Sequence, residues 1–485
     1  MLASTGPRAT AKLRIILLIT CMIIPLSLQL SSVHAATLAV GSDKNEYNKS
    51  ETVYITGTLT NGDSPIVGAD IAIEVKNDLA VKVFEAQVKT NGTGAFSTNL
   101  SIPNSFRTGQ YTIYAAYQSD RAQSTFTIVS RFTLDSKTNP AGTAWASGTY
   151  LLGAKVNQTS SSGPSGDQSA TSTTFTPTVE SLSVTLGSGD KLLLIGASQL
   201  WNDNPAVGSS ICISRNGTRI SGDMFAVGAS PIHRHLATAI AVDSPAAGTY
   251  TYTLDFKTNP TGKAWASGTY LLAVKISDSW SDGPTGDQST TSTSFTSTAE
   301  NVSVTVGSGE KLLLIGTSQL WNDNPAIGSS ICISRDGAII SGDMFAVGAS
   351  ANHRHLATAV AADSTIGSHT YTLDFKTDPG GKAWASGTYL LAVKISQSYS
   401  SGPTGDQSTT SNTFTPTAED LNLGIGSGDK LLVIGTSQLW NNNPPVGSSI
   451  CVSKDGTRIS GDMFAVGASL SHRHLATAIA VWTAP

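Results

Sequence analysis

A block of about 119 residues is written three times along this chain. The string SGDMFAVGAS ends at Ser230, Ser350 and Ser469, and the string HRHLATA follows each copy, beginning at His233, His353 and His472. This period is too long for a solenoid repeat or a propeller blade, but it is the length of a small domain. Most of the chain is therefore one domain in triplicate, and its function depends on what three copies achieve together.

The composition and the first residues bear on location. Charged residues make up only 13% of the chain, and 30 basic residues nearly balance 34 acidic ones, whereas nucleic-acid binding favours a basic surface. Residues 1–35 are typical of a secretory signal peptide, with basic residues before an apolar run and Val33-His34-Ala35 as the cleavage site. A retained membrane anchor is the alternative. We expect a secreted, extracellular or cell-surface protein that does not bind nucleic acid and has no transmembrane segment in the mature chain.

Cysteines and glycosylation sequons fit export. Cleavage would remove Cys21 and leave Cys212, Cys332 and Cys451, one in each repeat. An odd number of cysteines cannot all pair within one chain, and their apolar surroundings favour buried free thiols over interchain disulfides. Six Asn-x-Ser/Thr sequons predict a glycoprotein: Asn48, Asn91, Asn99, Asn157, Asn216 and Asn301.

Residues 36–130 differ in texture from the repeats. Short runs rich in β-branched residues, such as Ile71–Val75, predict a β-sandwich of about seven strands. The strings Glu51-Thr-Val-Tyr-Ile-Thr-Gly57, Gly94-Ala-Phe-Ser97 and Gly109-Gln-Tyr-Thr112 resemble the immunoglobulin-like, macroglobulin-type modules of prokaryotic surface proteins. The resemblance implies a spacer or a docking surface and carries no catalytic motif.

Each repeat reads as about eight short strands, which predicts an all-β jelly-roll sandwich. Asn216-Gly217 and its counterparts Asp336-Gly337 and Asp455-Gly456 are strong hairpin signals. The pattern resembles the tumour-necrosis-factor and complement-head jelly roll. The residues that carry the resemblance are an opening segment from Val302 to Gly316 and a closing segment from Tyr371 to Lys394. The resemblance implies a trimeric head that binds macromolecules, and it does not imply catalysis.

The repeats are out of phase with this pattern. Residues 131–155 look like a closing strand pair, residues 156–276 and 277–396 like complete units, and residues 397–485 like a unit without its last strands. Unpaired strand edges promote aggregation. The early pair could complete the last unit within the chain and form a monomeric pseudo-trimer. It could instead complete another molecule, giving a filament or homopolymer, or each block could fold locally in permuted order.

Three His-x-His pairs are the best chemical candidates: His233 and His235, His353 and His355, and His472 and His474. Residues two apart on a strand share a face, so both imidazoles could bind one zinc or copper ion. Two ligands are too few, but three units would offer six, or Asp223, Asp343 or Asp462 could join. The alternative is packing at a unit interface, where the face would continue as Ala237, Ala239 and Ala241.

A second candidate is a loop that combines an aromatic ring with amide and carboxylate groups, as ligand sites often do. The loop occurs once in each repeat. Its residues are Trp201, Asn202 and Asp203 in the first copy, Trp321, Asn322 and Asp323 in the second, and Trp440 and Asn441 in the third. The alternative is a buried tryptophan followed by ordinary turn residues.

The sequence contains no nucleophile elbow, phosphate loop or paired-acid motif, so we expect no catalytic residues and no enzyme. We expect a structural or adhesive protein whose trimeric head binds an extracellular protein or glycan partner. A metal- or carbohydrate-binding module and a filament subunit are the alternatives. No cofactor is expected unless the histidine pairs bind zinc or copper.

Overall fold

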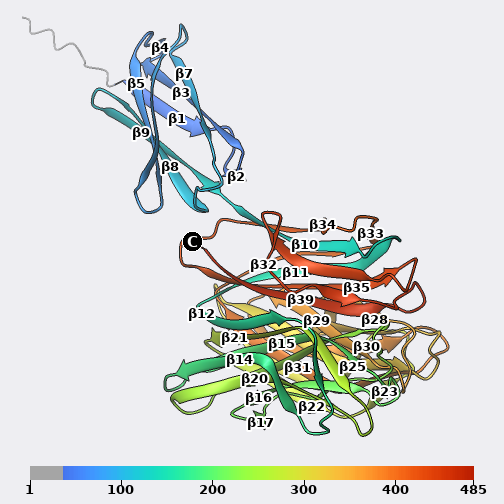
Figure 1. The fold of residues 1–485 in the computed structure, drawn as a ribbon. Coiled ribbons are helices and arrows are strands. Elements are labelled where there is room, and N and C mark those ends of the chain that lie inside the picture. Colours follow the sequence, from blue (N-terminus) through green and yellow to red (C-terminus); the bar gives the residue numbers. More distant parts are fainter. Residues whose placement is uncertain (1–35, 485) are drawn as a thin grey trace, which may run out of the picture.

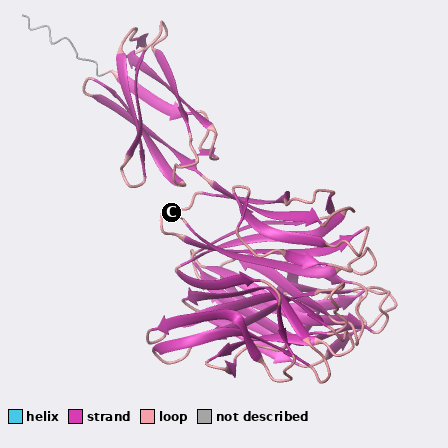
Figure 2. Ribbon diagram, in the orientation of Figure 1, coloured by secondary structure: helices cyan, strands magenta, loops and turns pink. Residues whose placement is uncertain are grey.

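A computed structural model describes residues 36–484 of the chain. The predicted signal peptide and Cys21 lie outside the described residues. Figure 2 shows strands and loops only, and residues 36–484 contain no helix. None of these residues forms a helix that could cross a membrane. Figure 1 shows an N-terminal sandwich beside a larger head made of three units.

The N-terminal domain is an immunoglobulin-like β-sandwich. One sheet joins β1, β3, β4 and β7, and the other has the order β2-β9-β8-β5-β6. Its strands are β1 (Thr37–Ser42), β2 (Glu46–Tyr47), β3 (Thr52–Asn61), β4 (Ser64–Pro65), β5 (Asp70–Asn77), β6 (Lys82–Lys89), β7 (Ala95–Ser101), β8 (Gly109–Tyr117) and β9 (Asp120–Ile128). Alternate residues of β3 and β5 are buried, as expected for strands that pack one face on a core. Thr108 at the edge of this domain donates a hydrogen bond to the backbone oxygen of Ile425 in the head (3.0 Å).

Each unit of the head packs two five-stranded sheets. In the first unit the sheets run β12-β21-β15-β19 with β13 beside β21, and β14-β20-β16-β17 with β18 beside β16. The strands are β12 (Gln158–Ser165), β13 (Gln168–Ala170), β14 (Thr176–Leu186), β15 (Lys191–Asn202), β16 (Ser209–Arg215), β17 (Thr218–Arg219), β18 (Met224–Ala226), β19 (His235–Asp243), β20 (Gly248–Thr258) and β21 (Ala264–Ile276). Strands from opposite ends of the unit pair in both sheets, which is a jelly-roll arrangement.

The second unit repeats this order. Its strands are β22 (Ser279–Thr285), β23 (Gln288–Thr290), β24 (Thr296–Val306), β25 (Lys311–Asn322), β26 (Ser329–Arg335), β27 (Ala338–Ile339), β28 (Met344–Ala346), β29 (His355–Asp363), β30 (Gly367–Thr377) and β31 (Ala383–Ile395). The third unit contains β32 (Gln397–Thr404), β33 (Gln407–Thr409), β34 (Thr415–Leu423), β35 (Lys430–Asn441), β36 (Ser448–Lys454), β37 (Thr457–Arg458), β38 (Met463–Ala465) and β39 (His474–Thr483).

Two early strands complete the third unit, β10 (Ser130–Thr138) and β11 (Ala144–Val156). The first lies between β34 and β36, and the second lies between β32 and β35. Figure 1 shows β10, in cyan, beside β34 from the red end of the chain. The strand pair therefore closes the three units into a ring within one chain. The arrangement in which each block folds locally in permuted order is not that of the structure.

The head has a core inside each unit and a shared core on the ring axis. The shared core joins Leu152, Leu272 and Leu391, one from each unit. Leu236 and Ile240 of β19 belong to this axial core, whereas Ala237, Ala239 and Ala241 lie in the core of the first unit. The expectation that the alanines line the unit interface is therefore wrong. The two histidines of a pair do not share a strand face, because β19 contains His235 while His233 lies in the turn before it.

Candidate metal centre

A tight turn places the first histidine of each pair beside the ring axis. In the first unit, the backbone of Ser230 and His233 forms an isolated two-residue bridge with hydrogen bonds of 2.8 and 2.9 Å. The chain then enters β19 at His235, which pairs with Leu200 of β15. The same bridge occurs in the other two units, so the three turns present equivalent histidines.

All six histidines meet at one place. We call the set that ends the turns the outer triad (His233, His353 and His472) and the set that begins the strands the inner triad (His235, His355 and His474). Each outer Nε2 lies 3.1–3.3 Å from an inner Nε2 of a neighbouring unit. Two outer Nε2 atoms, those of His233 and His353, are also 3.1 Å apart. Among residues 36–484, every group of three or more side chains placed to hold a metal is drawn from these six.

Burial keeps the cluster uncharged. The inner triad is about 3% exposed, and loss of hydration holds its pKa values well below the usual 6.5, with a smaller contribution from the other histidines. The same cause lowers the pKa of His233 to about 3 and those of His353 and His472 to about 4. Neutral imidazoles are the form that binds metals, so the site needs no loss of protons near neutral pH.

Three glycines make room for the outer triad. A Cβ atom on Gly228 would lie 2.1 Å from Nδ1 of His353, and one on Gly467 would lie 2.2 Å from Nδ1 of His233. Gly348 is related to His472 in the same way. All three glycines have a φ of +82° to +86°, a conformation that other residues adopt at a cost. The sequence analysis missed them, although each one precedes its own unit's histidine pair by a fixed five residues.

A polar layer around the histidines links neighbouring units. The guanidinium of Arg234, between the two histidines of the first unit, stacks on the ring of Trp201 at 4.0 Å and donates a hydrogen bond to Gln199 (3.2 Å). The Gln199 amide donates to the backbone oxygen of Asp462 in the third unit (2.9 Å). Equivalent hydrogen bonds from a glutamine amide to a backbone oxygen join the other neighbouring units, so one such bond links each pair of units.

Carboxylates do not join the histidines. Asp223, Asp343 and Asp462, the predicted additional ligands, form ion pairs with Lys257, Lys376 and Lys137 instead. The donor set on the axis is therefore six imidazole nitrogens, which suits first-row transition metals. Beside the inner triad lies only a small cavity of about 10 Å³, closed by Leu236 and its counterparts.

The tryptophan loops are built into the fold. Trp201 is about 3% exposed and stacks on Trp265 at a centroid distance of 5.7 Å. The buried Asn202 amide donates to Gly208 and Thr258, and Asp203 accepts a hydrogen bond from the indole of Trp265 (2.8 Å). Trp321, Asn322 and Asp323 repeat these contacts, as do Trp440 and Asn441 for theirs. The arrangement favours the core-and-turn interpretation.

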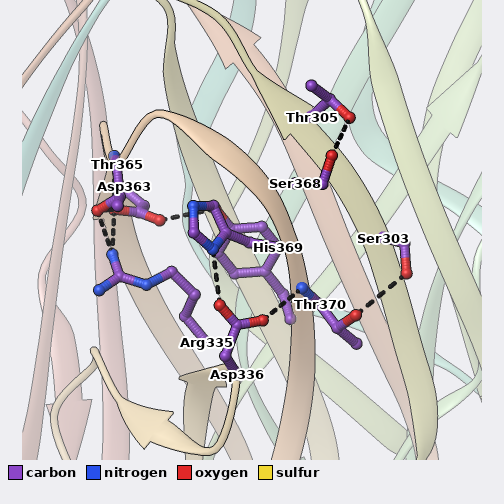
Figure 3. Close-up of polar contacts among 10 residues, drawn as sticks. Ser303, Thr305, Arg335, Asp336, Asp363, Thr365, Ser368, His369 and Thr370 are labelled. Carbon is purple, nitrogen blue, oxygen red and sulfur yellow. Dashed lines mark hydrogen bonds and ion pairs between the residues drawn. The ribbon is translucent and has the colours of Figure 1, made fainter.

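Other predicted positions lie away from the axis. The six sequon asparagines are exposed, and the three thiols are free and buried. His369, on β30 of the second unit, donates a hydrogen bond from Nδ1 to the Asp336 carboxylate (2.6 Å), and Figure 3 shows it among polar groups near Arg335. The bond to Asp336 raises its pKa. His369 thus provides a natural comparison for the buried six.

Comparisons with known proteins give little. No protein-family model and no curated protein matches the chain. Among solved structures, it is similar to native alpha-2-macroglobulin of E. coli, at 10% identity over 87% of this chain and 22% of that one, with a TM-score of 0.19. It is also similar to a tetra-tandem repeat from the extending region of a large adhesion protein, at 12% identity over 87% and 100% of the two chains, with a TM-score of 0.19.

A third similar structure is the adhesin InvE of Yersinia pseudotuberculosis, at 13% identity over 47% of this chain and 57% of that one, with a TM-score of 0.18. The chain thus spans about a fifth of the macroglobulin and just over half of InvE. TM-scores this low carry no argument about function. The likeness to tumour-necrosis-factor and complement heads stays a resemblance of strand pattern.

Proposed function

We propose that this protein is an exported structural and adhesive module, whose three-unit head binds a transition-metal ion on its axis. The observation that supports the metal is the convergence of six neutral imidazole Nε2 atoms from three units, with 3.1–3.3 Å between neighbours of the two triads. A bound ion would supply coordination bonds that tie the three units together. It would add to the apolar packing of the shared core and to the hydrogen bonds between neighbouring units.

The buried Nδ1 atoms of the inner triad set an energetic requirement for the same proposal. Nδ1 of each inner histidine is buried without a hydrogen-bond partner among the described residues. A neutral imidazole carries one N–H and one lone pair, so hydrogen bonds among the Nε2 atoms leave these three Nδ1 atoms unsatisfied in either tautomer. Unsatisfied buried polar atoms destabilise a fold by about 1–3 kcal/mol each. Coordination of all Nε2 atoms would leave each Nδ1 as a buried N–H without a partner, so the metal–imidazole bonds would have to outweigh this cost.

Metal analysis of the purified mature chain tests the proposal. After incubation with first-row divalent ions and removal of the excess, we expect about one ion per chain by elemental mass spectrometry. The triple variant His235→Ala, His355→Ala and His474→Ala should retain none, whereas the control His369→Ala should retain the ion. A wild-type chain that keeps no metal, or a triple variant that keeps all of it, would contradict the proposal.

The adhesive part is supported by the turns above the cluster. The strings that flank each turn are identical in the three repeats, but the two residues inside differ: Pro231 and Ile232, Ala351 and Asn352, and Leu470 and Ser471. All six are exposed, and Ile232 and Leu470 are 77% and 65% exposed. Exposed apolar side chains gathered at one end of a molecule are typical of an interaction surface.

A binding assay can test this tip separately from the metal. The double variant Ile232→Ser and Leu470→Ser removes its apolar side chains, and Ile366→Ser changes an equally exposed isoleucine (66%) elsewhere. We expect the double variant to lose binding to immobilised extracellular proteins, while the Ile366 variant binds like the wild type. Equal binding by all three, or binding to glycans that the double variant retains, would contradict a protein-binding tip.

A further inference from the structure

The arrangement of the two triads bears on which metal the axis selects. Building on the metal binding proposed above, we infer that one ion is held by all six imidazoles at once. We infer further that it is a divalent ion that accepts octahedral coordination, of the group Fe²⁺, Co²⁺ and Ni²⁺, rather than Zn²⁺ or Cu²⁺.

The distances match an octahedral centre. In an octahedron, neighbouring ligands are separated by √2 times the distance from ligand to metal. Where the two triads approach most closely, the spacing of 3.1–3.3 Å between Nε2 atoms corresponds to an ion about 2.2–2.3 Å from those nitrogens. The groups that lie within 4.8 Å of one another contain three histidines each, so opposite nitrogens would move slightly inward to bind the same ion. This distance is within about 0.2 Å of ordinary metal–imidazole bonds. Two stacked triangles, one from each triad, supply the six vertices.

The number and symmetry of the ligands disfavour zinc. Protein zinc sites are almost always four-coordinate. Four ligands chosen from two triads would leave two imidazoles beside the ion but not bound to it, in a core where unpaired polar atoms destabilise the fold. Copper(II) favours a tetragonal arrangement, which three equivalent units cannot provide. An octahedral ion would bind two imidazoles from each unit in the same way.

The charge of the surroundings favours a divalent ion over a trivalent one. No carboxylate is part of the cluster, and the nearest predicted candidates are paired with lysines. Arg234 and its two counterparts lie in the layer around the histidines. Each further positive charge on the ion would therefore be uncompensated in a region of low dielectric constant.

Six protein ligands leave no coordination position for water or a substrate. Catalytic metal sites keep such a position open, so the geometry assigns this ion a structural role. It would fasten His233 of the first unit to His474 of the third, and so on around the ring.

Cobalt titration of the chelator-treated wild-type chain tests the inference without any variant. We expect binding of one Co²⁺ per chain with the weak visible absorption of six-coordinate cobalt. Equimolar Ni²⁺ should displace it, in keeping with the general order of affinities, and equimolar Zn²⁺ should displace less than half. Single variants in either triad, His353→Ala or His355→Ala, should each weaken binding at least about tenfold. His369→Ala should leave it unchanged.

The outcomes separate this inference from the proposed function. Intense absorption from four-coordinate cobalt, tighter binding of zinc than of nickel, or a loss confined to one triad would overturn six-fold coordination while leaving metal binding intact. A chain that binds none of the ions would overturn both.

Discussion

Gly467 of the third unit makes room for a histidine of the first. Replacing it by alanine would destabilise the head in two ways, by strain in a left-handed backbone and by a clash with the imidazole ring, and a control glycine separates the two. At Gly456, in a hairpin of the same unit, φ is +76° and an added Cβ meets nothing within 4 Å. Gly456→Ala therefore costs only the left-handed strain, about 1–2 kcal/mol. At Gly467, φ is +82° and the Cβ would lie 2.2 Å from Nδ1 of His233. To reach an ordinary contact of about 3.5 Å, the ring must move by about 1.3 Å.

That movement exceeds what a metal site tolerates, about 0.2 Å in a bond length. In the metal-free chain, we expect Gly467→Ala to destabilise the head by about 1–3 kcal/mol more than Gly456→Ala, the usual cost of overpacking. In the metal-loaded chain the difference should grow by about 1.4 kcal/mol for each tenfold loss of affinity. Urea unfolding followed by tryptophan fluorescence, with and without chelator, measures the difference in stability between the two variants in the metal-free and the metal-loaded chain. If the two variants are equally stable, the glycine does not position the histidine.

Three further predictions concern acid, thiols and ring closure. Burial lowers the pKa values of the outer triad to about 3 or 4 in the folded chain, whereas the unfolded chain titrates near 6.5. The unfolded state then binds more protons between these values, so metal-free stability should be constant above about pH 6.5 and fall as the pH drops towards 4. A urea midpoint unchanged between about pH 7 and about pH 5 would refute this. Burial raises the pKa of the Cys212 and Cys451 thiols to about 12, so a thiol reagent should label them only in denaturant; rapid labelling of the native chain would show exposure. Removal of residues 130–156 deprives five strands of the last unit of a pairing partner, and we expect the shortened chain to associate in size-exclusion chromatography; a well-behaved monomer would show that closure is dispensable.

Local patterns predicted much of the fold. The alternation of apolar residues and the hairpin at Asn216-Gly217, whose φ values are both positive, identify strands directly from sequence. The early closing pair could be matched to the last unit because the repeat supplies an internal alignment. The observed pairing of Trp145 with Trp440 corresponds to that of Trp265 with Trp201.

The site was only partly predictable. His-x-His spacing identified the residues, but the meeting of the two triads depends on the ring, which no local pattern encodes. The predicted common face of the histidine pair and Ala237 was wrong: His233 lies in the turn before the strand, where alternation does not apply, and Ala237 lies in the core of its unit. Asp223 was a plausible ligand until its neighbour Lys257 was placed, 3.1 Å away.

Closure within one chain changes what a substitution does. In a trimer of identical subunits, every mutation appears three times around the axis. A harmful substitution therefore acts in all three subunits, and a useful one cannot be confined to a single subunit. Here each of the three turns is encoded separately, and Ile232, Asn352 and Leu470 occupy equivalent places with different chemistry. Such a gene can vary one third of its tip at a time while the buried histidines below remain the same in all three copies.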